Sequence, residues 1–250
     1  MSVADLTDRV VLVVGGTRGI GFATAVRAAS AGAEVVLTGR DETDAKHKAH
    51  EAARHSGGSV AGVGLEVTDD SAVQATVRAV AREHGRLDGL VVTAGILDEA
   101  VLGMVPTAQI QQILAVNVAG TISALQAGAR AMMRKKRGAI VVLGSVVGEE
   151  GAAGQSVYAA SKAAVVAAAR SAAKELGPHG IRVNAVAPGV IATDLVAGQS
   201  PAVVDRVVAA TSLGRLGTPD DVARVITFLL SEDAAFLTGQ VLRVDGGLAL

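Results

Sequence analysis

The chain has 250 residues, of which 50% are hydrophobic and 19% charged, and its formal net charge is −1. This composition supports a substantial core and excludes a disordered chain, and with only 2% aromatic residues and no basic tract it argues against nucleic-acid binding. Cysteine is absent, the five histidines lack catalytic-zinc spacing, and no apolar run reaches the roughly 20 residues of a membrane span. We therefore expect a cytoplasmic protein without disulfides, thiolate chemistry, a metal or a membrane partner.

Apolar runs alternate with helical patterns along the whole chain. The sequence predicts strands at residues 10–14, 35–38, 60–65, 90–93, 139–143, 181–187 and 241–244. It predicts helices at residues 23–30, 41–55, 69–84, 107–136, 155–176, 201–210 and 219–230. Strands that are apolar on both faces and alternate with helices indicate a parallel sheet covered on both sides. With no linker or repeat, residues 1–250 are predicted to form a single α/β domain, a doubly wound Rossmann-type sheet of about seven strands.

A glycine-rich turn follows the first predicted strand. Its spacing is G-x-x-x-G-x-G, and the residues expected to bind a cofactor are Gly15, Thr17, Arg18, Gly19, Ile20 and Gly21. Such glycines let the backbone approach a pyrophosphate, whose charge is favoured at a helix N-terminus. The alternative is an ordinary glycine-rich turn, but the position in the first βα unit favours a dinucleotide site.

The end of the second predicted strand bears on the choice of cofactor. An acid there would bind a ribose 2′-hydroxyl, whereas an arginine accommodates a 2′-phosphate. This chain has Gly39 followed by Arg40, and Arg18 can add a second cation. The sequence therefore predicts NADPH/NADP⁺, the alternative being that Arg40 is a solvated charge beside Asp41 and its acidic neighbours.

The only tyrosine, Tyr158, is followed four residues later by Lys162 and preceded by Ser145. On its own, Tyr-x-x-x-Lys is a weak motif, compatible with a half-buried helix tyrosine. The i, i+4 spacing places both side chains on one helix face. An ammonium there would lower the tyrosine pKa, which makes Tyr158 a candidate general acid/base.

Several motifs occur together in the order of one family. They are the glycine turn, Thr93-Ala94-Gly95, Asn117, Ser145, Tyr158-x-x-x-Lys162, and Pro188-Gly189 with Thr193. Over essentially its full length the chain resembles the short-chain dehydrogenase/reductases. The sequences of its motifs are most similar to those of 3-oxoacyl-[acyl-carrier-protein] reductases.

The resemblance implies a catalytic tetrad of Asn117, Ser145, Tyr158 and Lys162. Ser145 would stabilise the substrate oxygen, and Asn117 would hold a water that connects Lys162 to solvent. The further cofactor contacts that it implies are Arg40, Glu66, Val67, Thr93, Ala94, Gly95, Tyr158, Lys162, Pro188, Gly189, Ile191 and Thr193. The substrate pocket is expected to include Ile96, Ser145, Val147, Gln155 and Leu195.

Two departures from the family pattern lie in regions that face each other in the family. Val14 stands where threonine is usual before the first glycine, and Val92-Thr93 replaces two asparagines. We expect a paired exchange of polar for apolar packing, with altered loop stability and retained cofactor binding. Glu66 in place of the commoner aspartate is a milder change.

The resemblance implies an NADPH-dependent ketoreductase, with a 3-oxoacyl thioester as one candidate substrate. The basic run 134–137 could meet an acidic acyl carrier protein or could be a solvated helix end, and Glu149 and Glu150 count mildly against an anionic carrier arm. The alternatives are a dehydrogenase/reductase of a free or cyclic ketone or alcohol, and a non-catalytic dinucleotide-binding protein, against which the tetrad argues. We also expect a homotetramer, because the helix after Tyr158 is rich in small apolar residues.

Overall fold

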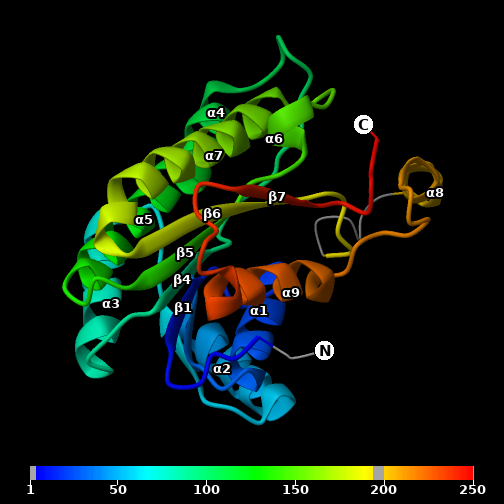
Figure 1. Ribbon diagram of the computed structural model, residues 1–250. Helices are drawn as coiled ribbons and strands as arrows, with labels where there is room; N and C mark the ends of the chain where they lie inside the picture. Colours follow the sequence, from blue (N-terminus) through cyan, green and yellow to red (C-terminus); the bar gives the residue numbers. More distant parts are fainter. Residues whose placement is uncertain (1–3, 194–199, 250) are drawn as a thin grey trace.

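A computed structural model of the chain describes residues 4–193 and 200–249. Seven strands form one parallel sheet in the order β3-β2-β1-β4-β5-β6-β7, which confirms the predicted doubly wound fold (Figure 1). In chain order the strands are Val10–Val14, Glu34–Gly39, Val60–Gly64, Gly89–Val92, Gly138–Leu143, Ile181–Pro188 and Val241–Val244. The order reverses between β1 and β4, so the carboxyl ends of these two strands flank the expected ligand crevice.

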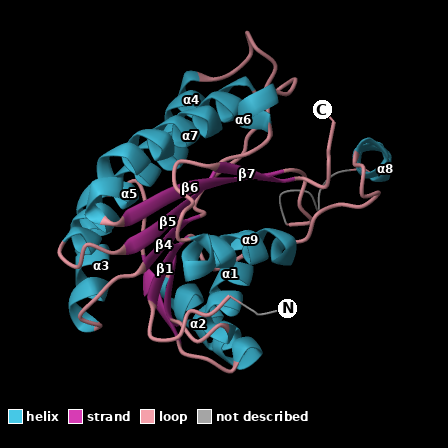
Figure 2. Ribbon diagram, in the orientation of Figure 1, coloured by secondary structure: helices cyan, strands magenta, loops and turns pink. Residues whose placement is uncertain are grey.

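Helices cover both faces of the sheet (Figure 2). On one face lie α1 (Gly19–Ser30), α2 (Glu42–Ser56) and α9 (Pro219–Leu230), and on the other α3 (Asp70–Glu83), α5 (Thr121–Met133) and α7 (Ser156–Leu176). Strand β1 illustrates why the strands are apolar on both faces of the sheet, since alternate residues pack against opposite helix layers. Val10, Leu12 and Val14 pack with the α3–α5–α7 layer, whereas Val11 and Val13 pack with the α1–α2–α9 layer.

The predicted helix 107–136 is three segments rather than one. It consists of α4 (Thr107–Ile113), a π-helical segment η1 (Leu114–Gly120) and α5, after which residues 134–137 are not helical. The wider π turn changes the direction in which side chains point, and such segments are frequent at functional sites. Asn117 lies in its middle and is fully buried.

Several short helices were absent from the prediction. These are α6 (Val147–Glu150), η2 (Gly177–His179) and η3 (Glu232–Ala234), and α1 begins at Gly19 rather than residue 23. Helix α8 (Pro201–Ala210) and α9 occur where predicted. Helices of three or four residues are too short to produce a periodic pattern, which is why the sequence did not indicate them.

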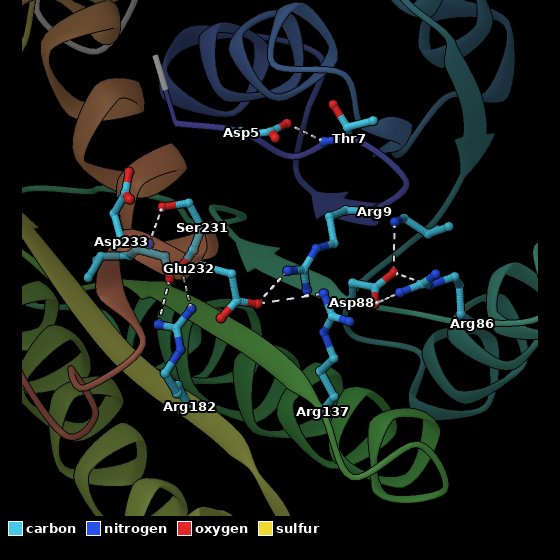
Figure 3. A network of polar contacts seen from close by, with 12 residues as sticks. Asp5, Thr7, Arg9, Arg86, Asp88, Arg137, Arg182, Ser231, Glu232 and Asp233 are labelled. Atoms are coloured by element: carbon cyan, nitrogen blue, oxygen red, sulfur yellow. Dashed lines mark hydrogen bonds and ion pairs between the residues drawn. The ribbon is translucent and has the colours of Figure 1, made fainter. Parts of the chain in front are cut away.

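Ionic and polar contacts fix the amino ends of the strands (Figure 3). The Asp88 carboxylate is buried and accepts from the Val10 backbone N–H at 3.0 Å and from the Arg86 guanidinium at 2.6 and 2.7 Å. Arg9 bonds Glu232, and Arg182 donates to the backbone carbonyls of Leu229 and Ser231. These bonds connect β1 to β4 directly, and connect β1 and β6 to the segment that ends α9, at the end of the sheet opposite the crevice.

We predict that Asp88→Ala lowers the free energy of unfolding by about 2 kcal/mol, because it leaves a buried N–H and a guanidinium without their acceptor. Lys46→Ala is the matched control, since it breaks an exposed i,i+4 pair with Glu42 and should cost at most about 0.5 kcal/mol. Urea unfolding of both variants measures the difference. Equal losses would contradict the role given to Asp88.

Candidate active site

Three segments bring the predicted tetrad together at the carboxyl edge of the sheet. Asn117 comes from η1, Ser145 follows β5, and Tyr158 and Lys162 lie on α7. Asn117, Ser145 and Lys162 are buried, with exposures of 0%, 7% and 4%. The Lys162 Nζ atom lies 5.7 Å from the centroid of the Tyr158 ring. The four residues therefore form one cluster, although their catalytic roles stay predictions at this point.

Asn117 connects three parts of the structure through its side-chain amide. Its Oδ1 accepts from the Ile96 N–H at 2.8 Å, and its Nδ2 donates to the Ile96 carbonyl at 2.9 Å and to Ser161 Oγ at 3.0 Å. Ser161 Oγ in turn donates to the Tyr158 carbonyl. The side chain thus braces the segment after β4 against α7, and the predicted water contact of Asn117 stays a prediction.

Lys162 places an ammonium in an almost fully buried position. Its Nζ donates to the Leu143 carbonyl at 2.9 Å, at the end of β5. Burial penalises the charged form and lowers the pKa of Lys162 from its usual 10.5 to about 8. Lys162 therefore stays protonated at neutral pH but lies close to its titration range.

The pKa of Tyr158 moves opposite to our expectation. Burial of the phenol raises the pKa above its usual 10, and the hydrogen bond with the Ser145 hydroxyl only partly offsets this. The predicted lowering by Lys162 was wrong for the cofactor-free chain, because burial is the larger effect and the ammonium bonds a carbonyl instead. In this state Tyr158 is a phenol that retains its proton, as a proton donor requires.

A cleft of about 560 Å³ runs along the carboxyl ends of β1, β2 and β4. It is lined by most of the predicted cofactor residues, namely Gly15, Thr17, Arg18, Gly19, Ile20, Gly21, Arg40, Glu66, Val67, Thr93, Ala94, Gly95 and Thr193. Of the other predicted cofactor contacts, Tyr158, Lys162, Pro188, Gly189 and Ile191 do not line it. Gly189 packs on Asp245, and Ile191 is buried against Gly217.

The cleft fits a dinucleotide at its glycine turn. Gly15 has φ +88°, and a Cβ there would lie 2.6 Å from the Ala94 backbone nitrogen, so the turn requires glycine. Helix α1 begins at Gly19 with no acid in its first turn, which leaves its positive dipole end available to a phosphate.

Arg18 and Arg40 have no carboxylate partner within the described part of the chain. The acids near Arg40 have other contacts. Asp41 caps α2 by accepting from the Asp44 N–H, and Glu42 pairs with Lys46. Both guanidinium groups are therefore available to an anion in the cleft.

The predicted substrate pocket is only partly assembled. Ile96 lines the cleft, and Val147 N–H donates to Ser145 Oγ at 3.2 Å. Gln155 donates to Glu99 at 2.6 Å, and Leu195 lies outside the described residues. Sequence analysis missed Gln112, Ala115 and Val116, which line the cleft from α4 and η1. They carry no motif, and Ala115 and Val116 lie in the π-helical segment, which the sequence did not indicate.

Comparison with known proteins connects this geometry to a family. A family model described as enoyl-(acyl carrier protein) reductase matches residues 14–249. The 3-oxoacyl-[acyl-carrier-protein] reductase FabG of Aquifex aeolicus is 37% identical, covering 97% of this chain and 98% of that protein. The chain is a short-chain dehydrogenase/reductase.

Other relatives of this dehydrogenase/reductase carry different names. The short-chain reductase protein NovJ of Streptomyces niveus is 37% identical, covering 98% of this chain and 95% of that protein. Carbonyl reductase family member 4 of Xenopus tropicalis is 38% identical, covering 97% and 98%. A solved short-chain type dehydrogenase/reductase from Mycobacterium ulcerans has a TM-score of 0.93 at 34% identity, covering 97% of this chain and 90% of that one.

Membership of the family makes this short-chain dehydrogenase/reductase an oxidoreductase that acts on CH–OH groups with a nicotinamide dinucleotide. No described helix is long and apolar enough to cross a membrane. Across residues 4–193 and 200–249, no cluster of three or more potential ligands could hold a metal ion.

We predict that Lys162→Met is more stable than the wild type at pH 7, because it removes a buried charge. The wild-type lysine has a lower pKa folded than unfolded, so the folded state binds fewer protons between pH 8 and 10.5. Wild-type stability therefore gains up to about 3 kcal/mol relative to the variant as the pH rises through this window. Urea unfolding at pH 7 and pH 10 tests this. An advantage of the variant that is independent of pH would contradict the buried-ammonium account.

Proposed function

We propose that this enzyme is an NADPH-dependent ketoreductase that reversibly transfers hydride between NADP(H) and a ketone or secondary alcohol. The observation that carries the proposal is the cleft itself. It begins at Arg18 and Arg40, passes the glycine turn, and ends at Gly95 and Leu143 beside the tetrad. An adenosine 2′-phosphate would lie at the arginine end and the nicotinamide at the end beside Tyr158.

The chain's own residues supply the proton chemistry in this proposal. The bound dinucleotide would supply or accept the hydride. Tyr158 would donate its proton to the carbonyl oxygen, while the Ser145 hydroxyl, which already bonds the phenol, would hold that oxygen in place. The Lys162 ammonium would stabilise the phenolate left behind and replace its proton.

We predict that Arg40→Asp shifts kcat/KM from NADPH toward NADH by at least tenfold, because the carboxylate repels a 2′-phosphate and accepts from a 2′-hydroxyl. The matched control is Arg54→Asp, a reversal of the same charge near the end of α2, away from the cleft. Steady-state kinetics with both cofactors tests the assignment. A wild-type preference for NADH would overturn it.

We predict that Tyr158→Phe loses at least 100-fold in kcat while the Kd for NADPH changes less than threefold, because only the transferable proton is removed. The measurement pairs turnover with calorimetric binding. Near-normal turnover would exclude Tyr158 as the acid/base.

A 3-oxoacyl thioester is the first substrate class we propose, because relatives named as 3-oxoacyl-[acyl-carrier-protein] reductases align over nearly the whole chain. Glu149 and Glu150, the acids that count against binding of an anionic carrier arm, lie beside an arginine in the structure. Arg243 bonds Glu150 and Asp245 and lies 3.8 Å from Glu149. The chemical objection to an anionic arm is therefore weaker than the sequence suggested.

The basic run 134–137 is poorly placed to bind a carrier protein that delivers substrate to the active site of the same subunit. Residues 134–137 precede β5, whereas Ser145 follows it, so the six-residue strand separates them by roughly 20 Å. Arg137 is already 3.6 Å from Glu232. This placement favours the solvated-helix-end interpretation and keeps a free or cyclic ketone as the second candidate. Assays with carrier-bound, free-thioester and cyclic ketones under NADPH discriminate between them.

A homotetramer is part of the proposal. The outer face of α7 exposes Ala160, Ala163 and Ala167, whose small side chains permit close helix approach by a second copy. The half-buried Ala168 packs on the core beneath, so a substitution there would test stability rather than assembly.

We predict that Ala167→Glu weakens association and lowers turnover together, because α7 also carries Tyr158 and Lys162. Ala79→Glu, at an exposed alanine on α3, is the control for added negative charge away from α7. Light scattering and turnover at the same concentration test the link. A fully active wild-type monomer would contradict it.

A further inference from the structure

Two threonine hydroxyls bond the backbone of Gly15, the first glycine of the turn. Thr38 Oγ1, at the end of β2, accepts from the Gly15 N–H at 3.3 Å. Thr93 Oγ1, just after β4, donates to the Gly15 carbonyl at 3.0 Å and lies 3.1 Å from the Val14 carbonyl. Both polar groups of Gly15 are therefore bonded by side chains from the two strands that flank β1.

The backbone of Gly15 is fixed only if neighbouring groups bond it, because glycine is conformationally free. Gly15 has φ +88°, a conformation that glycine reaches freely but does not prefer strongly over others. Fixing one such backbone costs on the order of 1–2 kcal/mol of conformational free energy. If the turn is already fixed before a ligand arrives, binding does not include that cost.

The hydroxyl on Thr93 belongs to one of the positions where the chain departs from its family's pattern. We expected the exchanges at Val14 and Val92-Thr93 to substitute apolar for polar packing. Val14 and Val92 do pack together in the apolar core, but for Thr93 the expectation was wrong, because its hydroxyl is hydrogen-bonded. Val14 is fully buried and contributes no hydroxyl, but Thr93 supplies one from the opposite side of the same contact. A hydroxyl therefore still links the glycine turn to the end of β4, but it belongs to Thr93 after β4 and not to the residue before the turn.

The Gly15 carbonyl and the Thr93 hydroxyl together explain a glycine in α1. A Cβ on Gly21 would lie 2.6 Å from Thr93 Oγ1 and 2.1 Å from the Gly15 carbonyl oxygen. The start of α1 therefore sits directly against the bonded peptide. Thr93 thus contacts both the backbone of the turn and the first turn of α1, the helix whose N-terminus faces the cleft.

We propose that Thr38 and Thr93 form a clamp on Gly15 that fixes the turn in its dinucleotide-receiving geometry before the cofactor binds. Thr93 is then a positioning residue that sets cofactor affinity and leaves proton transfer to the tetrad. This inference rests on the proposed cofactor cleft. Thr93 lines that cleft, and its hydroxyl bonds the Val14 and Gly15 carbonyls rather than a residue of the tetrad.

The test compares Thr93→Val, which removes the hydroxyl and keeps the shape, with Thr93→Ser, which keeps the hydroxyl. Thr227→Val is the matched control, because Thr227 is a buried threonine of α9 whose hydroxyl donates to the Ala223 carbonyl, away from the cleft. For each protein, calorimetry gives the Kd for NADPH, thermal unfolding gives the Tm without cofactor, and kinetics gives kcat at saturating NADPH.

We expect Thr93→Val to weaken NADPH binding about tenfold, with kcat at saturation within twofold of the wild type. Thr93→Ser should stay within threefold of the wild-type Kd. Thr227→Val should lower the Tm and leave the Kd unchanged, since its lost hydrogen bond lies elsewhere. Amide hydrogen exchange in the glycine turn of the cofactor-free protein should accelerate in Thr93→Val only.

An unchanged Kd in Thr93→Val, or a lower Tm without a Kd effect, would overturn the clamp and leave a packing role only. Equal loss of affinity in Thr93→Ser would also overturn it, because the hydroxyl would then be irrelevant. Failure of the wild-type chain to bind either nicotinamide dinucleotide would instead overturn the proposed cleft, so the two failures are distinguishable.

Discussion

The site depends on keeping the ammonium of Lys162 inside the protein, next to a phenol. A buried ammonium is costly, and its pKa falls to about 8 as a result. The surrounding residues give it space and one acceptor. A Cβ on Gly95 would lie 3.3 Å from Nζ, one on Gly148 would lie 2.9 Å from the Lys162 Cβ, and Nζ bonds the Leu143 carbonyl at the end of β5.

The same buried environment determines the state of Tyr158. Burial raises the pKa of the phenol, and the lysine is engaged with a carbonyl instead of the phenol oxygen. Without cofactor the site therefore holds a protonated phenol and a protonated lysine. That arrangement is suited to donating a proton to a ketone. Proton removal from an alcohol would need additional positive charge, which an oxidised nicotinamide would supply.

The sequence predicted the sheet because β1, β4, β5 and β6 are apolar on both faces, a pattern that only a doubly covered parallel sheet explains. It predicted the cluster of Asn117, Ser145, Tyr158 and Lys162 from family motifs. It could not indicate the π turn at Asn117, because residues 107–136 have continuous helical periodicity. Nor could it decide which residues of α7 face solvent, because Ala167 is exposed whereas its neighbour Ala168 packs on the core.

Electrostatic consequences were harder to infer than residue positions. The i, i+4 spacing of Tyr158 and Lys162 is a local fact, but the pKa of each depends on burial by segments far away in the chain. Likewise, the tie made by Thr93 requires knowing that β4 lies beside β1 and that the turn passes its hydroxyl. Such contacts follow from the assembled fold, and a single sequence gives no direct signal for them.

Titration of the single tyrosine tests this account most directly. With one tyrosine and no tryptophan in the chain, the ultraviolet absorbance of tyrosinate reports Tyr158 alone, and Tyr158→Phe gives the blank. The account predicts an ionisation midpoint above the usual 10 in the folded, cofactor-free enzyme and a lower midpoint with saturating NADP⁺, because the added positive charge favours the phenolate. A midpoint below 10 without cofactor, or one that NADP⁺ does not lower, would contradict it.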